Sequence, residues 1–526
     1  MRTPWTEIAA EKRANQDAHI DEHCSRNKEV CSDSNTLADI QTLTNSIKRG
    51  KLSAEDVIKA YIDKACAAHE KTNCLTEICF DKAIAHAKEL DEFQRKEGRL
   101  IGPLHGVPIS LKDQFNLKGL DTTLGYVGRA FKPATCNALL VDILEHLGAV
   151  IIAKTNLPQS IMWCETENPL WGLTTHPENP KLTPGGSSGG EAALLALHGS
   201  MVGWGTDIGG SIRIPSHMNG LWGLKPSAGR MPYKGVEVSL DGQQHVPSAV
   251  GPMARTLESL TLVTKLVIEA ESWTMDAQLP PLPWRHETFN DFTRRPLVIA
   301  VMLNDGMVKV HPPIERVLKE LISKLQEVGH EIVDWDTSMN AECIAIMQDA
   351  YYTADGGKDI HQAVTEGGEP FLPHVKALVD RAPPISVYEY WQLNKRKVAA
   401  QQAYQDMWSR ARAPSGRVVD LLLTPTMPHT AVPHRSCRWV GYTKLFNFLD
   451  YTALSFPAGK VSSELDPVAL PEYTPRNSLD AWNWETYDLA MMDGHDIGLQ
   501  IVGRRYEEEK VLGAAKQIDD LLRAET

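Results

Sequence analysis

Early in the chain, apolar residues recur at the spacing of helices. Between residues 36 and 98 they return every three or four positions, and Ser53 stands before Ala54-Glu55-Asp56 at a capping-box spacing. The apolar positions that follow share one helix face: Val57, Ile58, Tyr61, Ile62 and Ala65. This pattern predicts an α-helical lead-in.

From residue 101 short apolar runs alternate with helical segments and glycine-rich turns. The runs predict strands at residues 107–111, 149–153, 297–303, 331–335, 419–423 and 497–502. The intervening segments predict helices at residues 137–147, 191–200, 314–328 and 507–522. Such alternation is typical of an α/β fold, in which helices cover a sheet. The proline-rich residues 279–292 and the polar residues 461–490 are expected to be irregular.

Composition and charge exclude several classes of protein. Of the 526 residues, 42% are hydrophobic and 23% charged, which argues against a disordered or fibrous chain. The net charge of −13 argues against non-specific nucleic-acid binding, which needs clustered cations. No apolar run is long enough for a signal peptide or a membrane span, so we expect a cytoplasmic protein.

The nine cysteines are an odd number, and their spacings match neither a zinc module nor a disulfide scaffold. We therefore expect reduced thiols. One group, formed by His19, His23, Cys24 and Cys31, contains residue types that bind metals. Its mixed spacing differs from the known zinc patterns, and we assign no metal site.

A first candidate for chemistry is the run Gly185-Gly186-Ser187-Ser188-Gly189-Gly190. A helix-forming segment follows it, so these residues lie where a helix N-terminus exposes unpaired N–H groups. Alone, such a run also fits a flexible linker. It matches the nucleophile-elbow pattern of α/β-hydrolases at both serines, but residues 177–184 carry three prolines and cannot form the strand that the elbow needs. A phosphate-binding loop would need a Gly-Lys-Ser/Thr sequence, which is missing.

A second candidate, residues 205–215, follows the apolar run 201–204 and reads Gly-Thr-Asp-Ile-Gly-Gly-Ser-Ile-Arg-Ile-Pro. Its consecutive N–H groups would let a substrate oxygen approach the backbone, as an oxyanion hole requires. The alternative is a tight turn capped by Ser211.

Lys112 ends the apolar run 108–111, where burial of a charge is costly. A serine nucleophile needs a base, and a buried lysine with a lowered pKa can replace the usual histidine.

Together, these three elements resemble the amidase signature family of serine hydrolases. The spacing agrees as well, because Ser211 follows Ser187 by 24 residues and Lys112 by 99. Further stretches resemble the fungal acetamidase-like branch: Gly-Pro-Leu-His-Gly-Val-Pro at 102–108, Cys-Glu-Thr at 164–166, Asp-Leu-Leu-Leu-Thr-Pro-Thr at 420–426 and Leu-Gln-Ile-Val-Gly-Arg-Arg at 499–505. One departure is residues 494–498, where many members carry a Leu-Pro step.

The resemblance implies a lead-in at residues 1–51, helical in part, and one catalytic domain at residues 52–526. The domain would have the amidase signature fold, an α/β fold with a central mixed twisted β-sheet sandwiched between α-helical layers. It would hydrolyse a carboxylic amide through an acyl-enzyme, without a cofactor or metal. Ser211 would be the nucleophile, and Ser187, beside an unusual peptide geometry, would relay its proton to Lys112.

The resemblance also assigns supporting roles. The oxyanion would be held by the backbone N–H groups of Ile208, Gly209, Gly210 and Ser211. Ser188 would support the cluster by hydrogen bonding, and Asp207 and Arg213 would brace the loop. The acyl pocket would be lined by Ile161, Met162 and Trp163. The alternative interpretation of these three residues, as ordinary hydrophobic core, fits the sequence equally well.

Several functions stay open. Besides a short-chain acetamidase, the same parts serve a fatty-acid-amide-hydrolase-like enzyme, an aryl amidase and an amidase of a secondary-metabolite pathway. An amidotransferase subunit acting on aminoacylated transfer RNA is disfavoured by the acidic chain, and a non-catalytic binding protein by the complete triad. The expected partner is a small amide substrate, with no nucleic acid and a possible homodimer.

Overall fold

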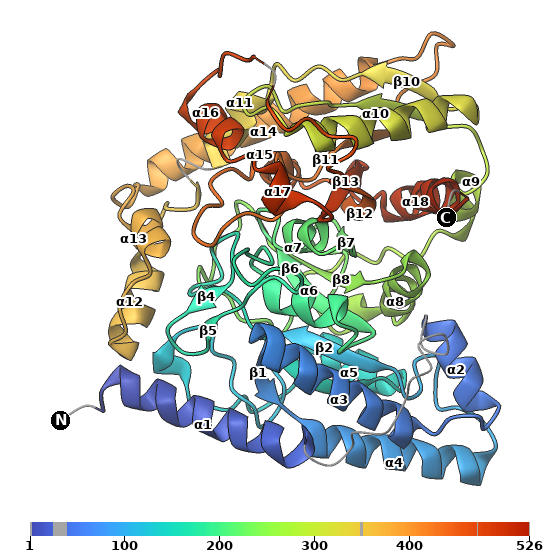
Figure 1. Ribbon diagram of the computed structural model, residues 1–526, viewed down its shortest axis with the longest axis vertical. Helices are drawn as coiled ribbons and strands as arrows, with labels where there is room; N and C mark the ends of the chain where they lie inside the picture. The colour runs from blue at the N-terminus through green and yellow to red at the C-terminus, as the bar shows by residue number, and fades with distance from the viewer. Residues whose placement is uncertain (1–2, 25–38, 348–350, 471, 525–526) are drawn as a thin grey trace.

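Eleven strands form one continuous sheet along the long axis of the molecule (Figure 1). The computed structural model describes residues 3–24, 39–347, 351–470 and 472–524. In spatial order the strands are β1 (Leu75–Ile78), β3 (Val150–Thr155), β2 (Pro108–Lys112), β6 (Val202–Asp207), β8 (Ala249–Ala254), β7 (Trp222–Lys225), β12 (Ala453–Lys460), β13 (Asp496–Val502), β11 (Leu421–Pro425), β9 (Val298–Val301) and β10 (Glu331–Asp334). Two short strands, β4 (Glu167–Asn168) and β5 (Gly172–Leu173), pair separately.

The sheet is mixed. Strands β3, β2 and β6 run parallel to one another, as do β11, β9 and β10, while the remaining neighbours are antiparallel. Every residue of β2, β3 and β6 is buried, as expected for strands covered on both faces. The predicted α/β architecture is therefore confirmed.

Helices pack on the sheet in groups. Helices α3 (Ala54–Thr72) and α6 (Gly189–Ala196) contact each other, β2 and β3. Helices α5 (Leu139–His146) and α8 (Leu257–Glu269) also contact each other; α5 packs on β3, and α8 on β7 and β8. The remaining elements are α1 (Trp5–Cys24), α2 (Ile40–Lys48), α4 (Phe80–Glu97), α7 (Arg213–Met218), α9 (His286–Phe292), α10 (Pro312–Glu327), α11 (Asn340–Ile346), α12 (Lys358–Gly367), α13 (Pro373–Val379), α14 (Val387–Arg410), α15 (Gly441–Phe448), α16 (Ser478–Glu485), α17 (Leu489–Met492), α18 (Glu508–Arg523) and the 3₁₀ turns η2 (Val127–Arg129) and η3 (Ser272–Thr274).

Three segments differ from their predicted structure. The helical pattern before residue 98 is interrupted by β1, an edge strand of four residues that is too short to reveal its alternation. The connector at 279–292 ends in α9, and the polar stretch 461–490 contains α16 and the start of α17. Helix α16 begins at a local signal, because the Asn477 side chain accepts the N–H groups of Leu479 and Asp480.

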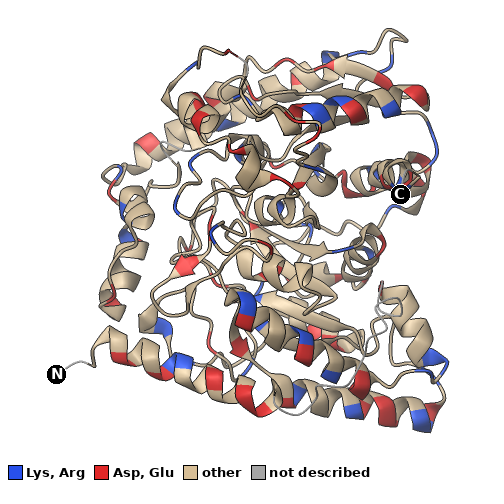
Figure 2. Ribbon diagram, viewed as in Figure 1, with Lys and Arg blue, Asp and Glu red and all other residues tan. Residues whose placement is uncertain are grey.

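Charged residues of both signs are interspersed over the outer helices (Figure 2). None of the described helices is long and apolar enough to cross a membrane.

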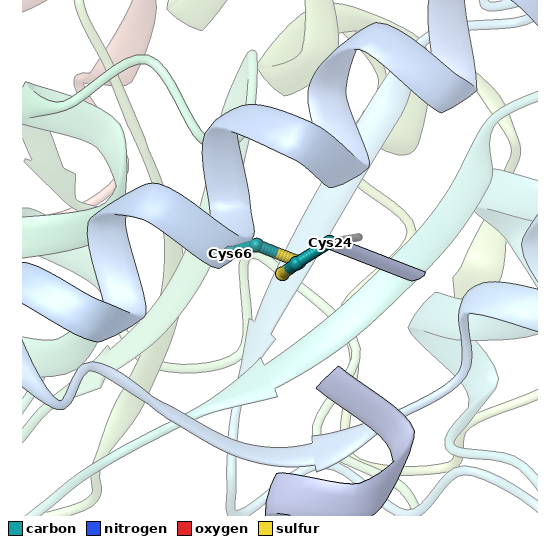
Figure 3. The surroundings of a disulfide bond; sticks show 2 residues. All are labelled: Cys24 and Cys66. Atoms are coloured by element: carbon teal, nitrogen blue, oxygen red, sulfur yellow. A yellow bond between two sulfur atoms is a disulfide. The ribbon is translucent and has the colours of Figure 1, made fainter. Parts of the chain in front are cut away.

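The last residue of α1, Cys24, forms a disulfide with Cys66 of α3 (Figure 3). The expectation that all thiols are reduced is therefore wrong for this pair. Because its sulfur is bonded to Cys66, Cys24 has no thiolate to offer to a metal group with His19 and His23. Cys31, the fourth member of that group, lies outside the described residues.

We predict that Cys24→Ser lowers the urea midpoint of unfolding under oxidising conditions. The bond closes a loop with a sequence separation of 42, for which chain entropy gives a loss of up to about 4 kcal/mol. Cys136→Ser, which removes an exposed free thiol, is the matched control. Equal midpoints for wild type and Cys24→Ser without reductant would contradict the prediction.

Candidate active site

Lys112 lies at the carboxyl end of β2, fully buried, beside the parallel strand β6. Its Nζ donates hydrogen bonds to Ser187 Oγ at 2.6 Å and to Thr206 Oγ1 at 3.1 Å. The Thr206 hydroxyl in turn donates to Gln114 Oε1 at 2.5 Å. Thr206 therefore has only its lone pairs to offer to Lys112, which fixes the direction of that bond.

Burial lowers the pKa of Lys112 to about 7, against the opposing charges of Asp207 and Glu191. No carboxylate oxygen of a described residue lies within 4.0 Å of its Nζ. Lys154 on the neighbouring strand is equally buried, but its Nζ lies 3.7 Å from Asp113 Oδ1. Of these two buried lysines, Lys112 is the one without an ion pair.

Glu191 in α6 is a buried carboxyl close to the same strand. It accepts hydrogen bonds from Ser110 Oγ at 2.6 Å and Thr155 Oγ1 at 2.9 Å. Burial raises the pKa of Glu191 to about 8, so at neutral pH it is mostly uncharged. An uncharged Glu191 does little to stabilise an ammonium on Lys112.

The glycine–serine run is a buried, packed turn and not a flexible linker. The peptide bond between Gly186 and Ser187 is cis, in line with the unusual geometry expected beside Ser187. A side chain at Gly186 would meet the backbone of Glu165, and one at Gly189 would collide with Thr166. Helix α6 begins at Gly189, where the sequence predicted a helix N-terminus.

Ser211 follows β6 and is 9% exposed. Its carbonyl accepts the Ser188 N–H at 3.1 Å, which ties the two serine clusters together. Support from Ser188 thus comes from its backbone, since its hydroxyl is buried and has no hydrogen-bond partner among the described residues. The hydroxyls of Ser187 and Ser211 are not hydrogen-bonded to each other in the described structure, but both residues line the same small cavity.

The loop from Asp207 to Ser211 corrects one oxyanion assignment. The N–H of Gly210 donates to Asp207 Oδ1 at 2.8 Å, so it is not available to a substrate oxygen. The N–H groups of Ile208, Gly209 and Ser211 have no acceptor among the described residues. Gly210 has φ +133°, and a side chain there would collide with Thr443, so glycine is needed at this turn.

Asp207 and Arg213 form a buried ion pair that fixes this loop. Arg213 Nε and Nη2 each donate to the carboxylate at 3.0 Å, and Asn447 Nδ2 donates to it at 2.8 Å. Burial alone would raise the pKa of Asp207, but the charge and hydrogen bonds of Arg213 hold it well below its usual range. Arg213 also donates to Asn447 at 2.7 Å and to Gln500 at 3.1 Å, which links the loop to α15 and β13.

Two cavities reach Ser211. The larger has a volume of about 130 Å³, and the three residues expected in the acyl pocket all lie on its wall: Ile161, Met162 and Trp163. The smaller has a volume of about 30 Å³, and Ser187 and Thr206 lie on its wall.

One group of residues outside this site consists of residue types that can bind a metal ion. Ligand atoms of His176, Glu178 and His495 lie within 4.8 Å of one another. However, His176 Nδ1 accepts a hydrogen bond from the N–H of Glu178 at 3.2 Å, and its Nε2 donates one to the Met218 carbonyl at 2.8 Å. Both ring nitrogens of His176 are engaged, so we assign no metal to the group. His495, from the stretch that departs from the family pattern, lines neither cavity at Ser211.

Sequence reasoning missed four polar residues of the site: Gln114, Glu191, Thr206 and Asn447. Glu191 had a signal, because it is the only charged residue in an otherwise apolar or glycine helix start. Thr206 lies inside the quoted motif and could have been considered as a partner of Lys112. Asn447 had none, since 240 residues separate it from Asp207.

Comparison with known proteins identifies the family of the chain. The family model described as Amidase matches residues 56–512. The chain is 63% identical over 524 residues to Amidase 1 of Gibberella moniliformis, covering 99% of this chain and 100% of that protein. It is 34% identical to the acetamidase of Emericella nidulans, with 99% of each covered. A solved structure of fatty acid amide hydrolase superimposes with a TM-score of 0.88 at 33% identity, covering 99% of this chain and 91% of that one. The chain therefore belongs to the Amidase family, the amidase signature enzymes, and is an amidase.

Proposed function

We propose that the enzyme hydrolyses a carboxylic amide through an acyl-enzyme on Ser211, with Ser187 and Lys112 as the proton relay. The observation that carries this proposal is the 2.6 Å contact between Ser187 Oγ and a buried lysine amine that has no described carboxylate partner. Since the pKa of Lys112 is lowered to about 7 by burial, a large fraction of the amine is neutral at physiological pH.

In the first step Ser211 Oγ attacks the amide carbonyl carbon. Its proton passes to Ser187, whose own proton passes to Lys112. In the relay the 2.6 Å bond between Lys112 Nζ and Ser187 Oγ reverses its direction: the neutral amine keeps one hydrogen on Thr206, and its lone pair accepts the Ser187 hydroxyl hydrogen. The proton then returns from Lys112 through Ser187 to the amide nitrogen, and the C–N bond breaks. Water attacks the resulting ester by the same relay and releases the carboxylate.

The negative oxygen of the tetrahedral intermediate would be held by the N–H groups of Ile208, Gly209 and Ser211. These groups have no described acceptor, and the loop that presents them is held by Asp207. Because such donors are fixed before reaction, each contributes to the transition state without reorganisation; removal of one typically costs about 3 kcal/mol.

Acetamidase-like hydrolysis of a short carboxylic amide to a carboxylate and ammonia or an amine is the activity that we favour. Support comes from acetamidase relatives at 34% and 36% identity. The fatty-acid-amide-hydrolase-like and secondary-metabolite alternatives use the same relay and differ only in the acyl group. An amidotransferase subunit would need partner subunits for activity, so hydrolysis by the isolated chain rejects that alternative.

We predict that Ser211→Ala abolishes covalent labelling by a fluorophosphonate, measured by intact mass spectrometry. Lys112→Ala and Ser187→Ala should lower kcat/KM for a primary amide by more than about 10⁴-fold, since each interrupts both proton transfers. Ser188→Ala is the matched control, because it removes a neighbouring hydroxyl that has no described partner. Full activity of Lys112→Ala would refute the relay.

We predict that kcat/KM rises with pH through about 7 and then reaches a plateau. Lys112 must be neutral to accept a proton, and with its pKa near 7 the neutral fraction increases tenfold per pH unit below that value. The variant Glu191→Gln tests whether this rise with pH belongs to Lys112 or to Glu191. If it belongs to Lys112, the rising limb of the pH profile persists in the variant. A rate that is constant from pH 5 to about 9, or a limb that disappears in Glu191→Gln, would count against a neutral Lys112.

We predict that Asp207→Asn destabilises the protein by about 3–5 kcal/mol, because it leaves the buried Arg213 without its charge partner. Urea unfolding monitored by tryptophan fluorescence measures the loss. Arg417→Gln, which breaks a surface pair with Glu331, should change stability little. Equal effects of the two variants would show that the buried pair does not stabilise the loop.

A further inference from the structure

The two cavities at Ser211 divide the substrate into an acyl side and an amine side, if the relay of the proposed function holds. In that relay the proton for the departing nitrogen comes through Ser187, so the nitrogen must lie on the Ser187 side of the carbonyl carbon. Ser187 and Thr206 line the smaller cavity, whereas Gly209 of the oxyanion loop lines the larger. The leaving nitrogen therefore belongs in the smaller cavity (the amine cavity) and the acyl group in the larger (the acyl cavity).

The amine cavity has no room for a substituent on the amide nitrogen. Its volume of about 30 Å³ is close to the space that one water molecule occupies in the liquid. An unsubstituted amide nitrogen fits this space. An alkyl chain on the nitrogen would have to displace the side chains that line the cavity.

A third cavity lies next to the amine cavity and is much larger. This outer cavity has a volume of about 340 Å³. Leu240 and Gln243 line both the amine cavity and the outer cavity, so they form a wall between the two. The outer cavity shares no described lining residue with the acyl cavity, so it adjoins the site on the amine side.

Hydrogen bonds fix residues 237–243, the segment that carries this wall (the wall segment). The N–H of Glu237 donates to the Gln114 carbonyl at 2.9 Å, and the Glu237 carbonyl accepts a hydrogen bond from Gln114 Nε2 at 2.8 Å. The Ser239 hydroxyl donates to the Ser160 carbonyl at 2.7 Å. A leaving group that is larger than the amine cavity would have to break these bonds to move the segment aside.

The two wall side chains are held in different ways. The Gln243 amide is bonded within its own loop, since its Nε2 donates to the Val246 carbonyl at 2.8 Å and its Oε1 accepts the Val246 N–H at 3.2 Å. Leu240 is half-buried and packs against the apolar cluster that contains Ile161. Because the Leu240 side chain has no polar group, its truncation opens the wall and leaves the hydrogen bonds of the segment intact.

We infer that the wall segment determines the size of the leaving group, and that Leu240 is the side chain that excludes substituted amines. The wall confines the amide nitrogen to the amine cavity, so the enzyme hydrolyses primary amides and releases ammonia. The space that an N-alkyl group would need lies behind Leu240, in the outer cavity. The inference rests on the proposed function and narrows its leaving group from ammonia or an amine to ammonia.

The test compares amides that share an acyl group and differ on the nitrogen: butanamide, N-methylbutanamide and N-propylbutanamide. In the wild type kcat/KM should fall by about 100-fold or more from butanamide to N-propylbutanamide, because the alkyl group overpacks the amine cavity. In Leu240→Ala the ratio of kcat/KM for N-propylbutanamide to that for butanamide should rise by about tenfold or more. The intrinsic reactivities of the two amides cancel when this ratio is compared between variant and wild type.

Two further variants assign the effect to the wall. Leu378→Ala is the matched control, because it truncates a leucine that lines the acyl cavity and not the amine cavity, and it should not raise the ratio. Ala354 lines the outer cavity and neither of the other two. The double variant Leu240→Ala/Ala354→Phe should therefore lose the gain of Leu240→Ala, because the phenylalanine fills the space that the alkyl group enters.

Two results would overturn the inference. If the wild type cleaves N-propylbutanamide as well as butanamide, the wall does not limit the leaving group, although amide hydrolysis stands. If the ratio stays at its wild-type value in a Leu240→Ala protein whose Ser211 is still labelled by the fluorophosphonate, or rises equally in Leu378→Ala, then Leu240 is not the determinant. Failure of the proposed function has a different signature, because Ser211 would then not be labelled and none of the three amides would be cleaved.

Discussion

The site depends on the burial of the Lys112 amine away from water. An ammonium on Lys112 would be surrounded by sheet and helix with no described carboxylate within 4.0 Å, so its hydration energy is lost without an ion pair to replace it. This cost arises where two parallel strands end side by side, and Ser187 Oγ, the proposed relay hydroxyl, lies 2.6 Å from the amine. An aspartate in place of Thr206 would provide the missing charge partner and would turn the base into a permanent cation.

The buried ion pair of Asp207 and Arg213 nearby stabilises a charged group, in contrast to the surroundings of Lys112. Asp207 is ionised because Arg213 and several N–H donors surround it, and it fixes the 207–211 loop together with the hydrogen bonds that the loop carbonyls accept. The site therefore combines a lysine without a described carboxylate partner, which suits the proton exchange proposed for it, with an aspartate that is fully paired and suits a positioning role. In the proposed mechanism their different surroundings, not their residue types, decide which one reacts.

The side chains that we propose to react could be singled out in the sequence because each lies in a local sequence feature. Ser187 and Ser211 stand in glycine-rich turns, and Lys112 ends an apolar strand. The alternating pattern likewise predicted most of the strands and the α/β class. What could not be predicted depends on contacts between distant segments: the loss of Gly210 as an oxyanion donor, and the Asn447 contact to Asp207. The Cys24–Cys66 bond was missed because an odd cysteine count with irregular spacing resembles a set of free thiols.

Arg213, the partner of Asp207, is itself held by residues from the C-terminal part of the chain. Arg213 reaches Asn447 in α15 and Gln500 in β13, and Gln500 in turn donates to the carbonyls of Pro425 and Tyr442 at 3.0 Å. During synthesis on the ribosome Ser211, the proposed nucleophile, therefore emerges almost 300 residues before Gln500, which supports Arg213. A chain that ends before β13 carries all three members of the proposed relay but lacks Gln500, so we expect the site to form only when this last strand has joined the sheet.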